Sequence, residues 1–278
     1  MLRRPFTEEP VSRLASWSSR LGWFSLAVAA LSIIILRSGF LEIVPSLATF
    51  AAALVFAVLA ILFALASSVV IWRLGFAGIG RAVTGFLIGC GLLAYPGYLG
   101  VKAYKLPPIT DVTTDPANPP RFDVIARLRP RGTSDYPRNS AVLQRTAYPN
   151  VVPLQVLTNP KATYDAVLSV VTKRRWVIVD ARPPTPSRRE GTIEAVARTI
   201  IMGFRDDVSI RVTPLGTGAQ IDVRSASRYG SHDFGANAAR VVALLDDIDD
   251  AAGAAGPEPK PEPEKVERKP QKRQAPSR

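Results

Sequence analysis

The sequence predicts three transmembrane α-helices, followed by a soluble α+β domain and a disordered Pro-rich C-terminal tail. Only four charged residues interrupt the stretch between Arg20 and Lys102, and they divide it into three apolar runs. Apolar and polar residues alternate over 208–226, which indicates a β-hairpin in an antiparallel sheet with helices packed on one face. From Gly256 onward the chain is mainly Pro, Glu and Lys, a composition that cannot form a core.

Each apolar run is able to cross a bilayer, which takes about 20 residues of helix. Leu21–Leu36 has sixteen uncharged residues and gains length from an interfacial Trp17 and a snorkelling Arg37. Leu47–Trp72 has twenty-six uncharged residues, and Ala82–Val101 has twenty. We therefore expect a membrane anchor over residues 1–105, with helices at about 17–40, 46–72 and 80–101.

Two features of the third run concern helix packing. Gly85 and Gly89 form a Gly-xxx-Gly pair, which lets another helix approach closely. The pair is typical of a seam within one chain or of a homo-oligomer contact, and the general glycine enrichment of membrane helices explains it equally well. Pro96 lies near the end of the run, where we expect it to bend or terminate the helix.

The flanking charges predict how the anchor is oriented. With a cytoplasmic N-terminus, six flanking arginines lie inside and three basic residues lie outside, as the positive-inside rule favours. Three spans then place the residues after Tyr104 on the outer side. We predict a bacterial inner (cytoplasmic) membrane protein with a periplasmic soluble domain. No Asp, Glu, Lys or His lies deep within a run, which favours an anchor over a transport pathway.

Composition divides the rest of the chain into three parts. Residues 106–158 hold too many prolines for long helices or central strands, so we expect an extended connector that packs on the domain. Residues 159–252 are predicted to form the α+β domain. Residues 253–278 are predicted to be a disordered tail rich in Pro, Glu and Lys.

Local patterns position the first elements of the domain. Asn159 followed by Pro160 is typical of a helix start, and apolar residues at helical spacing predict a helix over 161–174. Short apolar runs rich in β-branched residues predict strands over 176–181 and 192–199.

The hairpin and the last helix complete the predicted domain. Residues 214–217 form the expected turn, and pairing Thr213 with Gly218 places Asp207 opposite Arg224. A final helix is predicted to begin near Gly235, with Asp233 as its candidate N-cap.

Arginines of the hairpin and the last helix are the candidate binding residues. Strand alternation projects three of them from one face of the hairpin, and the adjoining helix N-terminus adds backbone N–H donors for an anion. The candidate ligand-binding residues are Arg211, Arg224, Arg228, Asn237 and Arg240. The candidate ion-pair partners are Asp206, Asp207, Asp222 and Asp233. We favour a structural ion-pair network, because such networks are commoner than ligand sites.

The sequence favours a non-enzymatic role. His232 is the only histidine, and consecutive residues such as Ser231, His232 and Asp233 diverge too far to form a catalytic triad. Cys90 is the only cysteine, so a thiolate metal cluster is impossible, and we predict no metal and no cofactor. The alternative is a membrane-tethered hydrolase or transferase that uses Asp207, or its neighbour Asp206, as a base near His232.

The charge distribution does not indicate nucleic-acid binding. The net charge is +12, yet residues 106–255 hold nineteen basic against sixteen acidic residues and show no basic stripe. The expected partners are the lipid bilayer, an anionic lipid, glycan or protein of the envelope, and a second copy of the chain through Gly85 and Gly89.

Several strings of residues point to a known family. They are Gly-Phe-Arg-Asp-Asp-Val at 203–208, Asp-Val-Arg-Ser-Ala-Ser-Arg at 222–228 and Asp-Phe-Gly-Ala-Asn at 233–237, followed by Arg240. They resemble the uncharacterised domain of unknown function family 1499, and residues 113–122 are similar to the entry motif of its bacterial members. The resemblance covers roughly 107–248 and implies a membrane or envelope setting without an activity. Val151 and Ala238 stand where many members carry Cys and Arg.

Overall fold

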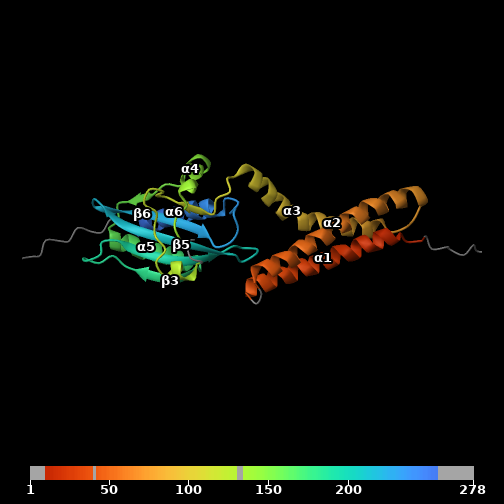
Figure 1. Ribbon diagram of the computed structural model, residues 1–278, viewed down its shortest axis with the longest axis horizontal. Helices are drawn as coiled ribbons and strands as arrows, with labels where there is room; N and C mark the ends of the chain where they lie inside the picture. The colour runs from red at the N-terminus through yellow and green to blue at the C-terminus, as the bar shows by residue number, and fades with distance from the viewer. Residues whose placement is uncertain (1–9, 40–41, 130–133, 256–278) are drawn as a thin grey trace, which may run out of the picture.

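A computed structural model describes residues 10–39, 42–129 and 134–255, and it shows a helical anchor followed by a sheet domain (Figure 1). The anchor helices are α1 (Arg13–Ser38), α2 (Ile43–Leu74) and α3 (Ile79–Lys105). All three are long and apolar enough to cross a membrane, so the predicted set of three membrane helices is confirmed. The predicted tail over 256–278 lies outside the described residues.

Small residues line the interior of the anchor. The buried residues of α1 and α2 recur at intervals of three and four, the spacing of left-handed helix pairs. They are Ala15, Ser18, Gly22, Ser25, Ala29 and Ser32 in α1, and Ser46, Ala53, Ala57, Ala60, Ala64 and Ser67 in α2. Because these side chains are short, the backbones approach closely, and the Ser18 hydroxyl donates to the Ala60 carbonyl across 2.8 Å.

Gly85 and Gly89 take part in this packing within the chain. A Cβ at Gly85 would lie 2.5 Å from the backbone carbonyl carbon of Ser18, and one at Gly89 would lie 2.8 Å from the Ala57 carbonyl oxygen. The glycine pair therefore faces α1 and α2, which is the intramolecular seam among the alternatives that the sequence left open.

Pro96 does not terminate α3, which continues to Lys105. A proline removes one backbone hydrogen bond, but in lipid no water competes for the remaining ones, so the helix continues past it.

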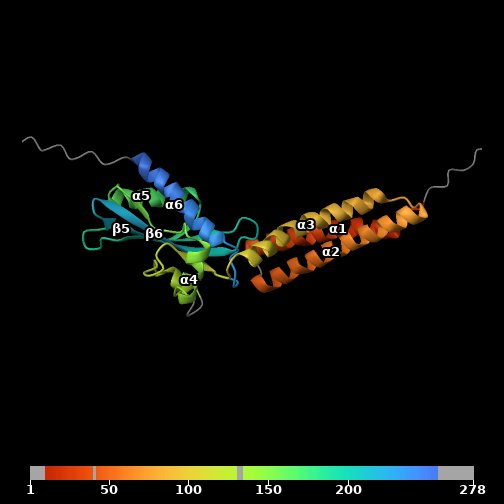
Figure 2. The same ribbon diagram turned by 90° about the horizontal axis from the view of Figure 1, so that it is seen from above.

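The soluble domain is built on a six-stranded antiparallel sheet in the order β1-β6-β5-β4-β3, with β2 also paired to β6. The strands are β1 (Asp111–Thr113), β2 (Leu154–Val156), β3 (Val177–Arg182), β4 (Gly191–Arg198), β5 (Arg205–Leu215) and β6 (Gly218–Ser227). Helices α5 (Pro160–Lys173) and α6 (Ala236–Ala255) cover one face, and α4 (Arg138–Ala147) lies on the other side (Figure 2). The predicted antiparallel sheet with helices packed on one face is confirmed.

The main core lies between the sheet and the helices α5 and α6. Its fully buried side chains come from alternate positions of the three central strands and from one stripe of each helix. They include Ile193, Val208, Ile210, Ile221 and Val223 from the sheet, and Val167, Val171, Val241, Leu244 and Ile248 from the helices.

The predicted hairpin register is wrong by two residues. Leu215, not Thr213, pairs with Gly218, so the chain reverses over two residues only, with Gly216 at a φ of +58°. A two-residue turn with a positive φ matches the twist of the flanking strands better than a four-residue one. Asp207 consequently pairs with Ala226 rather than with Arg224. A shift of two keeps every side chain on its predicted face.

The connector is more regular than expected. It contributes β1 and β2 to the sheet, a 3-10 helix, η1 (Ile125–Leu128), and the helix α4. Helix α4 fits because Pro137 and Pro149 flank it without interrupting it. The connector does pack on the domain, where it covers the sheet face opposite α5 and α6.

The anchor packing predicts unequal effects of two identical substitutions in α3. Gly85→Ala would place a methyl group against the α1 backbone, whereas Gly91→Ala meets no atom within 4 Å. Thermal unfolding of the full-length protein in detergent micelles should show a loss of about 1–3 kcal/mol for Gly85→Ala. Gly91→Ala is the matched control, since both changes alter helix propensity equally. Equal stabilities of the two variants would contradict the close α1–α3 seam.

Candidate functional site

The sheet separates the five candidate residues into two groups. Arg211, Arg224 and Arg228 project from the face that the connector covers, as strand alternation predicts. Asn237 and Arg240 lie in α6, which packs on the opposite face. The five residues therefore do not converge on one site.

Arg224 is buried in an ion pair with Asp111 of β1. Its Nε and Nη2 donate to the two carboxylate oxygens at 3.0 and 2.7 Å, and the side chains of Arg224 and Asp111 are only 3% and 6% exposed. The Phe122 ring lies 4.6 Å from the guanidinium carbon, and Nη2 also donates to the Ser134 carbonyl. Burial raises the pKa of the Asp111 carboxyl, and Arg224 acts against that rise.

A second buried pair joins Arg228 to Asp207. The Arg228 Nε and Nη2 donate to Asp207 Oδ1 at 2.9 and 2.7 Å, and Arg129 approaches Oδ2 at 3.3 Å from the connector. Burial raises the pKa of the Asp207 carboxyl, while Arg228 and Arg129 lower it. Both oxygens of this fully buried carboxylate are therefore already occupied by arginines.

Two further side chains hold the connector on this face. The Glu194 carboxylate of β4 accepts hydrogen bonds from the backbone N–H groups of Asp123 and Ile125, each at 2.7 Å. Gln144 of α4 accepts from the Thr113 N–H and donates to the Thr113 carbonyl. The polar sheet face is thus a set of fasteners for the connector along most of its length.

Asp111, Arg129, Glu194 and Gln144 were missed by the sequence reasoning. Glu194 carried a usable signal, because it is an acidic residue flanked by apolar neighbours inside a strand. The other three lie in the Pro-rich connector, where no periodicity marks the buried positions.

The candidates on α6 form a separate, satisfied cluster. The Asn237 side chain donates to the Thr110 carbonyl and to Ser227, and it accepts from Ser225 and Arg240. Arg240 also pairs with Asp206. The cluster fastens α6 to β6 and to the chain entering β1.

Asp233 caps the N-terminus of α6. Its carboxylate accepts from the backbone N–H groups of Gly235 at 2.8 Å and Asn237 at 3.0 Å. The backbone donors that could have held an anion there are therefore directed at Asp233.

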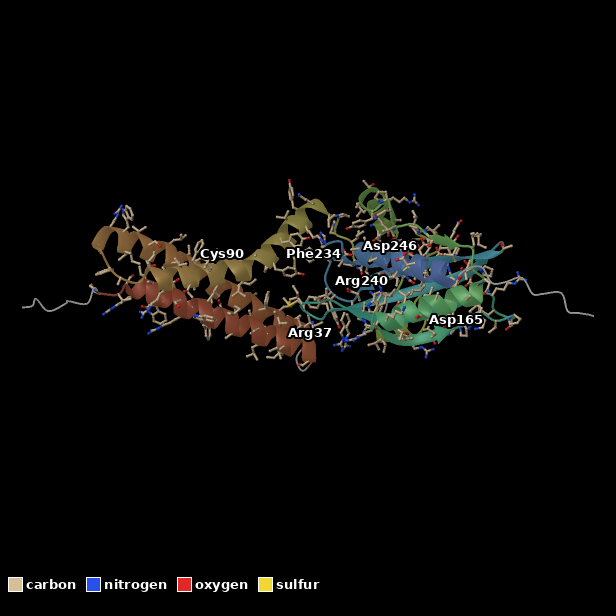
Figure 3. All side chains as sticks on the ribbon, turned by 180° about the vertical axis from the view of Figure 1, so that it is seen from behind. Arg37, Cys90, Asp165, Phe234, Arg240 and Asp246 are labelled. Atoms are coloured by element: carbon tan, nitrogen blue, oxygen red, sulfur yellow. The ribbon has the colours of Figure 1, made fainter. Side chains whose placement is uncertain are left out.

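His232 connects the domain to the membrane anchor. Its ring stacks on Phe234 with the centroids 4.7 Å apart, and Nδ1 accepts from the Phe234 N–H. This leaves Nε2 to donate to the Leu106 carbonyl, just beyond the end of α3. Figure 3 shows Phe234 at the end of the domain that adjoins the anchor.

An open pocket of about 370 Å³ lies at the far end of the connector face. Its lining is polar and of mixed charge, and it is formed by Asn118, Pro120, Arg121, Asp123, Glu190, Thr192, Glu194, Ser209 and Arg211. Arg211 reaches Asp222 at 3.0 Å and Asp115 at 3.3 Å through Nη2, while its Nε has no partner within the described residues. Of the three sheet arginines, Arg211 is the one that lines this pocket.

No group of three or more His, Cys, Asp and Glu side chains able to hold a metal occurs in the part of the chain that the structure describes.

The architecture is that of an α+β domain carried on a membrane anchor, with its polar face closed by buried arginine–aspartate pairs. The profile of the family described as "Protein of unknown function (DUF1499)" matches residues 111–248, which confirms the resemblance over the sheet domain from β1 into α6. No curated protein sequence matches the chain significantly.

One solved structure with a similar arrangement is the crystal structure of the protein TTHA0849 from Thermus thermophilus. It has a TM-score of 0.23 and 11% sequence identity, and the match covers 37% of this chain and 96% of that one. A likeness this distant carries no argument about function.

The buried pairs predict a large difference between two equivalent substitutions. Asp111→Asn would leave Arg224 without its carboxylate in a buried site, which costs about 3–5 kcal/mol. Asp123→Asn breaks an exposed pair with Arg182 and should cost at most about 1 kcal/mol. Differential scanning calorimetry of the full-length protein would show a melting temperature roughly 10 °C lower for Asp111→Asn. Similar melting temperatures for the two variants would contradict a structural role for the Asp111–Arg224 pair.

Proposed function

We propose that this protein is a membrane-anchored binding module of the bacterial cell envelope, not an enzyme. The pocket beside Arg211 is its ligand site. The observation that carries this proposal is the unequal use of the three sheet arginines. Arg224 and Arg228 lie buried against Asp111 and Asp207, whereas Arg211 lines an open, polar pocket. Its volume falls within the range of small-molecule sites, roughly 300–1,000 Å³.

The lining of the pocket favours a carboxylated glycan among the envelope ligands considered. Arg121 is exposed and offers a charged donor to a carboxylate, while Glu190 and Asp123 offer acceptors to hydroxyl groups. A lipid phosphate or an acidic peptide would bring anionic acceptors without these donors and would meet the same carboxylates unfavourably. A sugar acid satisfies both kinds of side chain.

The geometry offers less support for the hydrolase or transferase alternative. Asp207 would have to accept a proton while both of its oxygens are held by Arg228 and Arg129. His232 would have to exchange its contacts with Phe234 and Leu106 for a substrate. Both side chains are better accounted for by the contacts that they already make.

The binding proposal predicts a charge-specific loss in the pocket. A hyaluronan tetrasaccharide, which carries glucuronate, should bind the full-length protein in nanodiscs, and Arg121→Gln should weaken the affinity about tenfold. Arg189→Gln is the matched control, because Arg189 is an exposed arginine outside this pocket. Isothermal titration calorimetry measures both, with neutral cellotetraose as the reference sugar. Equal affinities of the two variants, or no binding of the tetrasaccharide, would refute the assignment.

We also propose that the N-terminus is cytoplasmic and the sheet domain periplasmic in an inner membrane. This follows from the excess of flanking arginines on the N-terminal side and from an odd number of spans.

The proposed orientation can be measured with single cysteines. Cys90→Ala removes the only native thiol, and Leu215→Cys or Leu74→Cys then places one at an exposed position at either end of the molecule. A membrane-impermeant maleimide should label Leu215→Cys in intact spheroplasts and should label Leu74→Cys only after permeabilisation. The opposite pattern would show that the domain faces the cytoplasm.

A further inference from the structure

The loop between β4 and β5 exposes apolar side chains at the anchor end of the domain. This interfacial loop, residues 199–204, carries Ile200, Ile201 and Met202 at its tip. Ile200 is 93% exposed and Ile201 is 37% exposed. Adjacent exposed isoleucines are unfavourable in water, and such clusters mark contact with a partner or a membrane.

A contact with α1 places this loop at the height of the bilayer surface. Arg37, in the last turn of α1, donates from Nη1 to the Ile200 carbonyl at 2.5 Å and to the Ile201 carbonyl at 3.2 Å. Gly203 has a φ of +73°, and a Cβ there would lie 3.0 Å from the Arg37 side chain. Arg37 is the residue expected to snorkel to the headgroups, and Figure 3 shows it where the anchor meets the domain. The apolar tip is therefore beside the end of a membrane span.

Basic side chains surround the base of the loop. Arg198 and Arg205 are exposed and pair directly opposite each other across β4 and β5. Like charges in this arrangement repel, and neither arginine has an ion-pair partner among the described residues. With Arg37 they form a collar of three cations around an apolar tip. Anionic phospholipid headgroups supply the missing counter-charge at that depth.

We propose that the interfacial loop inserts into the leaflet that adjoins the soluble domain. Ile200, Ile201 and Met202 enter the headgroup–acyl boundary, and Arg198, Arg205 and Arg37 bind lipid phosphates. Lipid is the favoured occupant because the outward-facing side chains of α1 just below Arg37 are apolar, including Ile34, which is 63% exposed. The loop and the end of α3 then attach the domain to the bilayer at two separate points.

This second attachment gives the domain a defined orientation. The strands run roughly along the long axis that the domain shares with the anchor (Figure 1). Thr192, in the wall of the open pocket, is six residues along β4 from Arg198, a separation of about 20 Å. Insertion of the loop therefore directs the pocket away from the membrane.

Spin-label accessibility tests the insertion directly. In a Cys90→Ala background, Ile200→Cys and Leu215→Cys each take one nitroxide, at the anchor end and at the far tip of the same sheet. The full-length protein is placed in nanodiscs of phosphatidylcholine with or without phosphatidylglycerol. Oxygen concentrates in lipid and the neutral nickel complex NiEDDA in water. Position 200 should therefore show high oxygen and low NiEDDA accessibility, and position 215 the reverse.

The collar is tested by adding Arg198→Gln and Arg205→Gln to the Ile200→Cys variant. Phosphatidylglycerol should deepen the label in the parent and leave it unchanged in the double substitution. A label at 200 as accessible to NiEDDA as that at 215 would overturn the insertion. A label shielded from both reagents would also overturn it, because protein would then cover the loop. No dependence on phosphatidylglycerol in the parent would overturn the role of the arginine collar.

Discussion

The buried ion pair between Asp111 and Arg224 is the interaction on which the connector face depends. Each ion loses several kcal/mol of hydration on burial, and only a close, well-oriented partner offsets that loss. Asp111 follows the end of α3 by six residues, so the pair positions the chain as it leaves the anchor. From there the connector runs across the sheet, where Glu194 and Gln144 fasten it. Without this cover, the charged face would be open to solvent along its whole length.

Sequence patterns predicted the faces of the sheet better than its pairings. Alternation in the hairpin correctly assigned Arg211, Arg224 and Arg228 to one side, although the predicted register was displaced by two residues. The period of a strand is two, so that error changed the partners and not the faces. Asp111 could not be recognised as the partner of Arg224, because it lies 113 residues away in a segment without periodicity.

The candidate site was predicted in part for a related reason. Arg228 and Asn237 are nine residues apart, which suggested a common pocket, but the chain crosses from one face of the sheet to the other between them. Proximity along the chain says little about proximity in space once a strand ends and a helix begins on the opposite face. The pocket itself combines residues from the connector, β4 and β5, and no local pattern could have assembled them.

The anchor and the domain place complementary demands on one short region of the molecule. Helix α1 ends in an arginine that needs acceptors at the membrane surface, and the β4–β5 loop offers two carbonyl oxygens there. At the end of α3, His232 makes a second contact through the Leu106 carbonyl. A single covalent exit would leave the domain free to rotate about the connector, whereas two contacts on different helices restrict that rotation. The domain is therefore best regarded as a part of the membrane surface, with its open pocket at the end farthest from the lipid.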